Sequence, residues 1–197
     1  MVQYFTFQNR VVMEAPGLAE AQWVHLCPPF NEGDVDNYAS HFGIPVDFIL
    51  DSLDIDERSR YEIEEEGKLI LINSPVINQT VKENEAIYVT VPIGIIIVEG
   101  KVITVTQQDN PIIDRILSQK VKNFFPVDAS MFVLLIFEQN VLWFLDCLKK
   151  LNLKRNLIEQ ELYDSSRNEE LRQLLKIEKS LVYFVNSLSA NDLLMMK

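Results

Sequence analysis

The sequence predicts an α/β fold followed by a long antiparallel helical hairpin. Up to about residue 125, short apolar segments with a period of two alternate with segments of helical period, as in domains that mix strands and helices. From residue 128 to residue 163 there is neither glycine nor proline, which permits one helix of about 36 residues. With 48% hydrophobic residues the chain can build a real core.

The N-terminal segments favour strands. Two of them lie within Val2–Met13, where YFTF and VVM are separated by the turn residues QNR. A third is Trp23–Leu26, and the two prolines that follow end it because neither can donate a hydrogen bond to a neighbouring strand. We expect Trp23 to face the core and His25 to face away from it.

Two short helices come next. In NEGDVDNYASHFG, apolar residues fall at helical spacing, acidic residues crowd the first turn, and Gly43 stands where a C-terminal cap belongs. The second helix opens with Pro45, which suits the first helical turn, and directs Phe48, Ile49 and Leu53 towards a core.

The stretch Leu50–Asn73 is strongly acidic, with eight carboxylates and three basic groups. Its periodicity divides it into the end of a helix, a connector, and a hairpin that begins at Arg60. Glu62 and Glu64 fall on the polar face of an amphipathic strand. We therefore interpret these carboxylates as a solvated surface rather than as a metal or catalytic site.

A second hairpin is the clearest local prediction. IGIIIV and KVITVT are joined by Glu99 and Gly100, and the glycine can take the positive φ that such a turn requires. Asn110 and Pro111 then start a helix with the sequence PIIDRIL.

The helical hairpin consists of the helix from Asp128 to about Tyr163 and a second helix from about Asn168 to Ser189. Both carry apolar residues at heptad-like spacing, with one charged exception each, Arg155 and Glu178. The predicted seam is formed by Leu134, Phe137, Val141, Phe144, Leu148, Leu151, Arg155, Ile158 and Leu162, facing Leu171, Leu174, Glu178, Leu181, Val185 and Leu188. A fold about residue 166 places the two exceptions opposite each other, so we hypothesise that they form an ion pair that sets the register. The alternative is that both side chains extend into solvent from a loose seam.

Charge and composition narrow the classes of partner. A net charge of -11 and a pI near 4.6 disfavour nucleic acid and anionic membrane surfaces, whereas carboxylates suit hard cations such as Mg²⁺ and Ca²⁺. Two widely spaced cysteines indicate a reducing compartment. No signal peptide is apparent, and the longest apolar run, Met131–Phe137, is far shorter than the roughly 20 residues of a membrane span.

The residues of an assembled catalytic or metal site are missing from the sequence. His25, Cys27 and His41 could begin a zinc site, but they have no fourth ligand and no compact spacing. There is no glycine-rich phosphate loop and no nucleophile elbow. We therefore expect no enzyme, no catalytic residues and no organic cofactor, and any metal ligands stay unknown.

The order of these pieces resembles the N-terminal cytoplasmic domain of CorA-type magnesium transporters. The similarity runs from WVHLCPPF through the acidic stretch to the hairpin IIIVEGKVITVTQ, the helix PIIDRIL and the segment LVYFVNSLSANDLL. The motif positions are Trp23, Leu26, Phe42, Gly43, Leu53, Asp54, Glu57 and Arg58. Ser59 departs from the pattern, because the family commonly has proline after Glu-Arg.

The resemblance implies a cytoplasmic α/β domain over residues 1–125, with a mixed sheet flanked by helices on both faces. It also implies a helical hairpin over residues 126–190 and the start of a stalk helix at 191–197. The family continues into two membrane spans with a Gly-Met-Asn motif, so we expect a soluble fragment that ends before the membrane and cannot itself conduct ions.

The resemblance further implies a regulatory role at the cytoplasmic face of the cell membrane. In the family, five such domains form a homopentameric funnel, and Mg²⁺ bound by acidic residues between neighbours keeps the pore closed. The fragment alone would be monomeric or weakly associated, and contact with the membrane would come only through the missing C-terminal segment. The alternative is a soluble α/β scaffold whose helical hairpin mediates protein–protein interaction.

Overall fold

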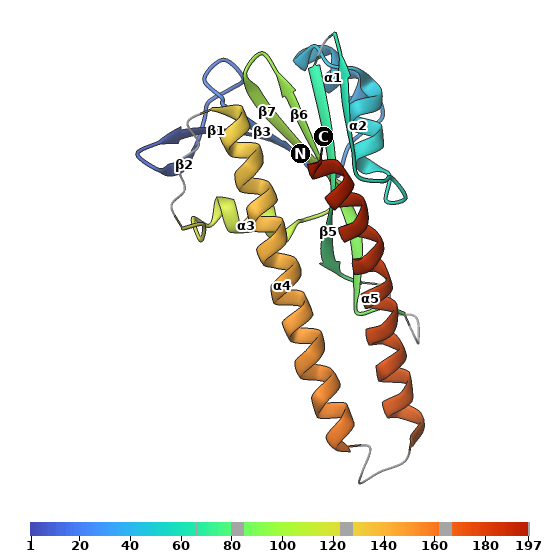
Figure 1. Ribbon diagram of the computed structural model, residues 1–197. Coiled ribbons are helices and arrows are strands. Elements are labelled where there is room, and N and C mark those ends of the chain that lie inside the picture. Colours follow the sequence, from blue (N-terminus) through green and yellow to red (C-terminus); the bar gives the residue numbers. More distant parts are fainter. Residues whose placement is uncertain (66, 80–84, 123–127, 162–166, 197) are drawn as a thin grey trace.

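The computed structural model describes residues 1–65, 67–79, 85–122, 128–161 and 167–196, which form one seven-stranded sheet with five helices (Figure 1). The elements are β1 Val2–Gln8, β2 Val11–Glu14, β3 Trp23–Leu26, α1 Asp34–Phe42, α2 Val46–Leu53, β4 Arg60–Glu64, β5 Gly67–Ile77, β6 Tyr88–Val98, β7 Lys101–Thr106, α3 Pro111–Leu117, α4 Ala129–Glu161 and α5 Arg167–Met195. The strand order is β2-β1-β3-β7-β6-β5-β4. Strands β3 and β7 run parallel and the other described pairs run antiparallel, so the sheet is mixed, as predicted.

The centre of the sheet consists of two hairpins. The predicted turn between β6 and β7 is confirmed, with Glu99 at φ 48° and Gly100 at φ 76°. Strands β5 and β6 pair over their whole lengths, from Lys68 opposite Ile97 to Ile77 opposite Tyr88. Strand β4 accompanies β5 only as far as Leu71, so the second half of β5 has no strand neighbour on that side.

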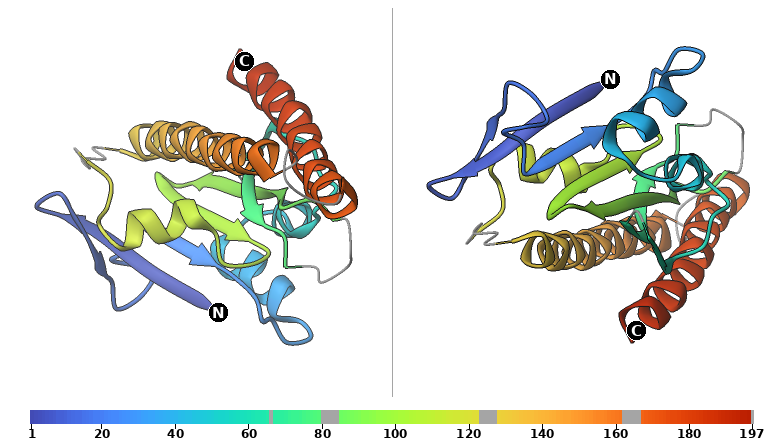
Figure 2. Two further views of the ribbon diagram at one scale, coloured as in Figure 1. Left: turned by 90° about the horizontal axis from the view of Figure 1, so that it is seen from below. Right: turned by 90° about the horizontal axis from the view of Figure 1, so that it is seen from above.

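Helices cover both faces of the sheet, as predicted (Figure 2). On one face, α3 and α4 pack on alternate side chains of β6, among them Ile93 and Ile95. On the other face, α1 and α2 pack on Leu69 and Leu71 of β5. The central strands are covered on both faces, which explains why their sequences are nearly continuous apolar runs.

His25 is buried, so the prediction that it faces away from the core is wrong. It is 5% exposed, and its Nδ1 lies 2.9 Å from Thr104 Oγ1, which also accepts a hydrogen bond of 2.8 Å from Trp23 Nε1. Strand β3 lies between β1 and β7, and all four of its residues are buried. A polar-out alternation applies only to a strand with one solvated face.

Helix α2 lies unusually close to β6. A Cβ atom added at Gly94 would lie 1.8 Å from Ser52 Oγ and 2.4 Å from Ser52 Cβ. Ser52 is fully buried, and its hydroxyl donates a hydrogen bond of 2.6 Å to the Phe48 carbonyl of its own helix. The position therefore requires glycine because of the close approach.

The two long helices run antiparallel and extend beyond the sheet (Figure 1). They meet in a third apolar cluster, where Phe144 and Leu151 of α4 contact Ile177 and Phe184 of α5. Within the described residues, one helix, over Ala129–Gln160, is long and apolar enough to cross a membrane by length and composition. That test is passed equally by core helices, and α4 buries Phe132 against the sheet.

The predicted seam is wrong for the C-terminal half of α5. Leu181, Val185 and Leu188 are 39%, 63% and 37% exposed. Figure 2 shows α5 crossing α4 at an angle, so that its C-terminal end moves away from α4. This half of α5 instead buries Ser180 and Ser187 against the sheet.

The hypothesised ion pair of Arg155 with Glu178 is not formed. Arg155 Nε lies 3.4 Å from Glu159 Oε1 on its own helix, and no ion pair joins it to α5 in the part of the chain that the structure describes. Both side chains are exposed, in agreement with the alternative of a loose seam. Helix α5 also continues unbroken to Met195, so the predicted boundary at residue 190 lies inside a helix.

Negative charge is concentrated in the α/β part. Residues 1–125 contain 19 of the 29 acidic residues but only 9 of the 18 basic ones, whereas residues 126–197 contain 10 and 9. The sheet and its short helices therefore carry nearly all of the net charge of -11.

Candidate functional site

The predicted motif residues separate into a structural set and a set that lines a groove. Trp23 and Leu26 of β3 are fully buried, and Phe42, the last residue of α1, is 6% exposed in the core. Gly43 ends α1 in the left-handed conformation at φ 65°. These four positions build the fold, whereas Asp54, Glu57 and Arg58 lie on the connector, residues 54–59, which joins α2 to β4.

Asp54 shapes the start of the connector. Its backbone N–H donates to the Leu50 carbonyl at 3.1 Å, and its Oδ1 accepts the N–H of Asp56 at 3.0 Å. Its carbonyl accepts the N–H of Glu57 at 3.2 Å. A short acceptor side chain that bonds the backbone two residues later is a common turn former.

Arg60, at the start of β4, gathers three carboxylates around one guanidinium. Nη2 lies 2.5 Å from Asp51 Oδ2, Nη1 bonds Glu57 Oε2, and Nε lies 3.3 Å from Glu62 Oε2. These side chains are about one third exposed, so solvent screens each pair. The cluster ties the end of α2, the connector and β4 together.

Burial raises the pKa of Asp51, and Arg60 opposes this shift only in part. The guanidinium also faces Glu57 and Glu62, so its positive charge is shared among three anions. Glu57 acts in the same direction as burial, because a neighbouring negative charge disfavours the charged form of Asp51.

A buried polar cluster joins the connector to both long helices. We call Ser59, Asn73, Asn140 and Asn191 the asparagine cluster. Asn191 Oδ1 accepts hydrogen bonds from Ser59 Oγ at 2.6 Å and from the Asn73 N–H at 3.1 Å. The Asn73 carbonyl accepts from Asn191 Nδ2 at 2.9 Å and from Asn140 Nδ2 at 3.0 Å.

The position of the asparagine cluster follows from the sheet. Because β4 begins at Arg60, opposite Leu71, the peptide groups of Asn73 lie beyond the part of β5 that pairs with β4. Asn73 is 7% exposed, and buried backbone groups must find partners. The side-chain amide of Asn191 offers one acceptor and one donor, so it takes the place of the missing strand.

A groove of 600 Å³ lies between the connector and α5, and we call it the connector groove. Glu57, Arg58 and Ser59 line it on one side, and residues of α5, including Tyr183 and Asn186, line it on the other. Asn73 also lines it, so the groove borders the asparagine cluster. The structure thus brings two of the predicted motif residues, Glu57 and Arg58, to one polar surface with α5.

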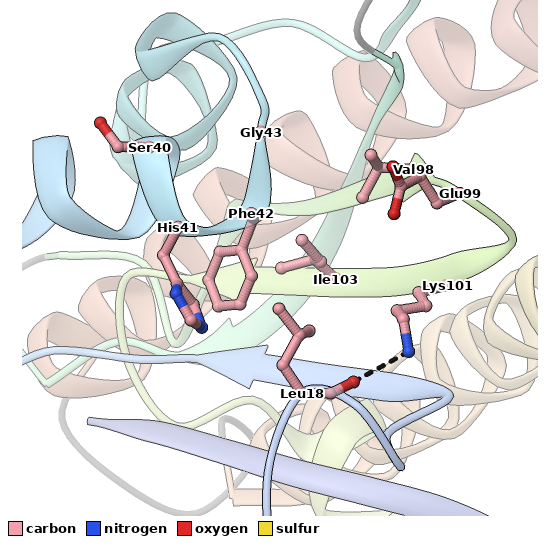
Figure 3. Close-up of a pocket in the computed structure, with 9 residues that line it drawn as sticks. All are labelled: Leu18, Ser40, His41, Phe42, Gly43, Val98, Glu99, Lys101 and Ile103. Atoms are coloured by element: carbon pink, nitrogen blue, oxygen red, sulfur yellow. Dashed lines mark hydrogen bonds between the residues drawn. The ribbon is translucent and has the colours of Figure 1, made fainter.

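Phe42 and Gly43 border a smaller pocket of 240 Å³ (Figure 3). Its ionisable side chains are Glu99, His41 and Lys101. The Lys101 ammonium donates to the carbonyls of Leu18 and Ala21, at 2.8 Å each, and lies 3.5 Å from a third carbonyl. An ammonium has three donors, so Lys101 serves the loop before β3 and has no donor left for a ligand.

The described part of the chain contains no group of three His, Cys, Asp or Glu side chains that could hold a metal ion. His25 is buried against Thr104, whereas His41 is exposed and packs its ring against Phe42. The three carboxylates around Arg60 already face a cation. The described part of one copy therefore offers no ready-made group of three side-chain ligands for a metal ion.

Sequence reasoning missed both Arg60 and the asparagine cluster. Arg60 was placed at the start of a strand without a role. Apolar stretches of the sequence are interrupted by Asn73, Asn140 and Asn191. Polar residues within apolar stretches could have indicated a buried, hydrogen-bonded cluster.

Comparison with known proteins finds a matching family model and solved structures with the same fold. The sequence model of the family described as CorA-like Mg²⁺ transporter protein matches residues 19–196. No curated protein matches the chain significantly.

Solved structures with the same fold include three with related descriptions. The soluble domain of CorA from Methanocaldococcus jannaschii is 19% identical with a TM-score of 0.81, and the match covers 100% of this chain and 78% of that chain. The complete CorA magnesium transporter of the same organism is 21% identical with a TM-score of 0.82, covering 100% of this chain and 62% of that one. The ZntB cytoplasmic domain from Vibrio parahaemolyticus RIMD 2210633 is 10% identical with a TM-score of 0.68, covering 98% and 77%.

Proposed function

Because the chain belongs to the CorA-like Mg²⁺ transporter family, we propose that it is the cytoplasmic regulatory part of a transporter for Mg²⁺ or another divalent cation. The observation that carries this proposal is the family match over residues 19–196, supported by the shared fold of the CorA soluble domain. The chain spans 62% of the length of the complete CorA structure. Ion conduction would therefore belong to other parts of the whole transporter.

The proposed regulation is a linkage between cation binding and assembly. Copies of the acidic α/β part repel one another, because residues 1–125 carry most of the net negative charge. Divalent cations bound between copies reduce that repulsion and favour the assembled, closed state by their differential affinity for it.

Ligands from more than one copy would complete the proposed sensing site. Carboxylates on the described surface are numerous, but within one copy no three of them are placed to hold a metal ion. Mg²⁺ demands near-octahedral oxygen ligands and keeps several waters, so one or two carboxylates from each of two neighbours would suffice. A homopentamer at the cytoplasmic face of the membrane is the arrangement we propose for the whole protein.

The proposal includes no catalytic role. Burial raises the pKa of the Cys147 thiol to about 12 and also raises that of Cys27, which disfavours the reactive thiolate. The comparisons give no support to the alternative of a scaffold that binds partners through its helical hairpin.

A titration with MgCl₂ tests the sensing role. We expect millimolar Mg²⁺ to raise both the thermal midpoint and the sedimentation coefficient of the chain, because cations bound between copies stabilise the assembled folded state. NaCl at matched ionic strength is the control, since it screens charge without bridging carboxylates. If Mg²⁺ changes neither quantity beyond the NaCl control, this chain does not hold a complete sensing site.

A further inference from the structure

The last turns of α5 are attached to the rest of the molecule mainly by polar side chains. We call Ser187–Met195 the α5 end segment. Ser187 Oγ donates to Thr90 Oγ1 at 2.7 Å, and Asn191 makes the bonds of the asparagine cluster. Of its apolar residues, only Leu194 belongs to a buried core cluster among the described residues.

The preceding part of α5 is held differently. Ile177 and Phe184 are 5% and 1% exposed and pack against α4 in the third apolar cluster, where Phe144 and Phe184 lie edge to face with ring centroids 5.2 Å apart. Aromatic contacts of this kind add to the large area that the rings bury. Phe184 is therefore the last residue of this cluster on α5, and the buried side chains that follow are polar at Ser187 and Asn191 and apolar only at Leu194.

The α5 end segment also has a hollow on each flank. On one side is the connector groove, lined by Ser189, Ala190 and Leu193 of the segment. On the other side a cleft of 320 Å³ separates it from α4, lined by Leu188, Asp192 and Met195. Open space therefore borders the segment on both flanks, and its buried side chains, Ser187, Asn191 and Leu194, hold it to the rest of the molecule.

We propose that the α5 end segment is a hinged arm that the asparagine cluster holds against the sheet, and that this cluster couples the arm to the connector. The hinge lies between Phe184 and Ser187. When the arm leaves the sheet, the Asn73 peptide loses both of its hydrogen bonds to Asn191 and keeps those to Ser59 and Asn140, and Ser59 loses the acceptor Oδ1 of Asn191. The position of the arm and the conformation of the connector therefore change together.

This coupling gives Glu57 and Arg58 a physical link to α5. The Glu57 carbonyl lies 3.4 Å from Asn73 Nδ2, and the Glu57 carboxylate bonds Arg60. A ligand or charge that moves the connector would thus alter the hydrogen bonds that hold the arm. The inference rests on these contacts alone and does not depend on cation binding.

Hydrogen exchange followed by mass spectrometry tests the arm in the metal-free chain. In Asn191→Ala, we expect the amides of the α5 end segment to exchange about tenfold faster, because each lost buried hydrogen bond shifts an opening equilibrium by up to about that factor. The amides of residues 177–184 should change far less. Asn186→Ala is the matched control, since Asn186 is exposed on the same helix and makes no side-chain hydrogen bond within the described residues.

Two further variants separate the arm from general instability and test the coupling. Thr90→Val removes only the Ser187 bond, and it should accelerate exchange in the same segment. Ser59→Ala should do so too, and its effect combined with Asn191→Ala should be smaller than the product of the two single effects, because both act through one cluster. If amide exchange accelerates uniformly over the sheet, or does not accelerate in the α5 end segment, the proposal of a hinged arm is wrong. If the effects of Ser59→Ala and Asn191→Ala are independent, the proposed coupling to the connector is wrong.

Discussion

His25 is a neutral core residue. It is 5% exposed between β1 and β7, and burial lowers its pKa from 6.5 to about 4, an effect that the contact with Thr104 opposes only in part. Desolvation disfavours the imidazolium because the cation loses its hydration. In the unfolded chain the same imidazole is exposed and takes a proton near pH 6.5.

Stability should therefore fall as the pH decreases from 6.5 towards 4. In that window the unfolded chain binds a proton that the folded chain does not, which costs about 2 kcal/mol of unfolding free energy between pH 7 and pH 5. Urea unfolding at several pH values measures this slope. His25→Gln keeps a hydrogen-bonding partner for Thr104, and it should remove the contribution of His25 to the decrease in unfolding free energy between pH 6.5 and 5. If the unfolding free energy of both proteins changes equally with pH in this range, His25 is not the group responsible.

Sequence reasoning at the residue scale found the family motif but not its partners. Asp54, Glu57 and Arg58 were recognised by their spacing. The asparagine cluster could not be predicted, because its four members are up to 132 positions apart and meet only once the pairing of β5 with β4 stops short of Asn73. A buried side-chain amide must form hydrogen bonds, but the sequence alone does not identify the peptide group that is its partner.

At the scale of elements, the contact of α2 with β6 depends on Gly94. In Gly94→Ala, the new methyl group would overlap Ser52, so α2 must move away from the sheet. We expect a loss of about 1–3 kcal/mol in unfolding free energy, as is typical of overpacked cores. Chemical denaturation measures it, and Gly17→Ala is the control because nothing lies within 4 Å of that position. Equal stability of the two variants would show that α2 is not held in this contact.

The strands and helices themselves were largely predictable, whereas the packing of the hairpin was not. The β6–β7 turn was predicted from Glu99 and Gly100, because local turn chemistry sets it. The seam between the long helices was predicted from apolar spacing alone. In the structure, Ser180 accepts the N–H groups of Ile87 and Tyr88 at 2.9 and 3.1 Å, so a polar face of α5 turns to the sheet and the helices diverge. The apolar heptad pattern does not indicate that the sheet competes with α4 for contact with α5.

At the scale of the whole molecule, the uneven charge distribution is the main electrostatic feature. Residues 1–125 contain ten more acidic than basic residues, and residues 126–197 contain one more. The described ion pairs are few and partly exposed, as around Arg60. Surface pairs of this kind contribute about 0–1 kcal/mol each. Repulsion within the α/β part should therefore exceed the stabilisation that these pairs provide.

Screening this repulsion should stabilise the chain. Raising NaCl from about 10 mM to about 150 mM shortens the Debye length from roughly 30 Å to roughly 8 Å, which weakens repulsion across the α/β part more than it weakens pairs in contact. We expect the thermal midpoint of the dilute chain to rise with NaCl. The measurement is made below the concentration at which copies associate, so that assembly does not contribute.

A falling midpoint would mean that local pairs such as those around Arg60 outweigh the net charge. Arg60→Gln separates the two effects, because it removes one cation and all three of its pairs while leaving the carboxylates in place. The variant should be less stable than the wild type at low salt and should gain more from added NaCl, since Asp51, Glu57 and Glu62 then repel one another without a cation between them.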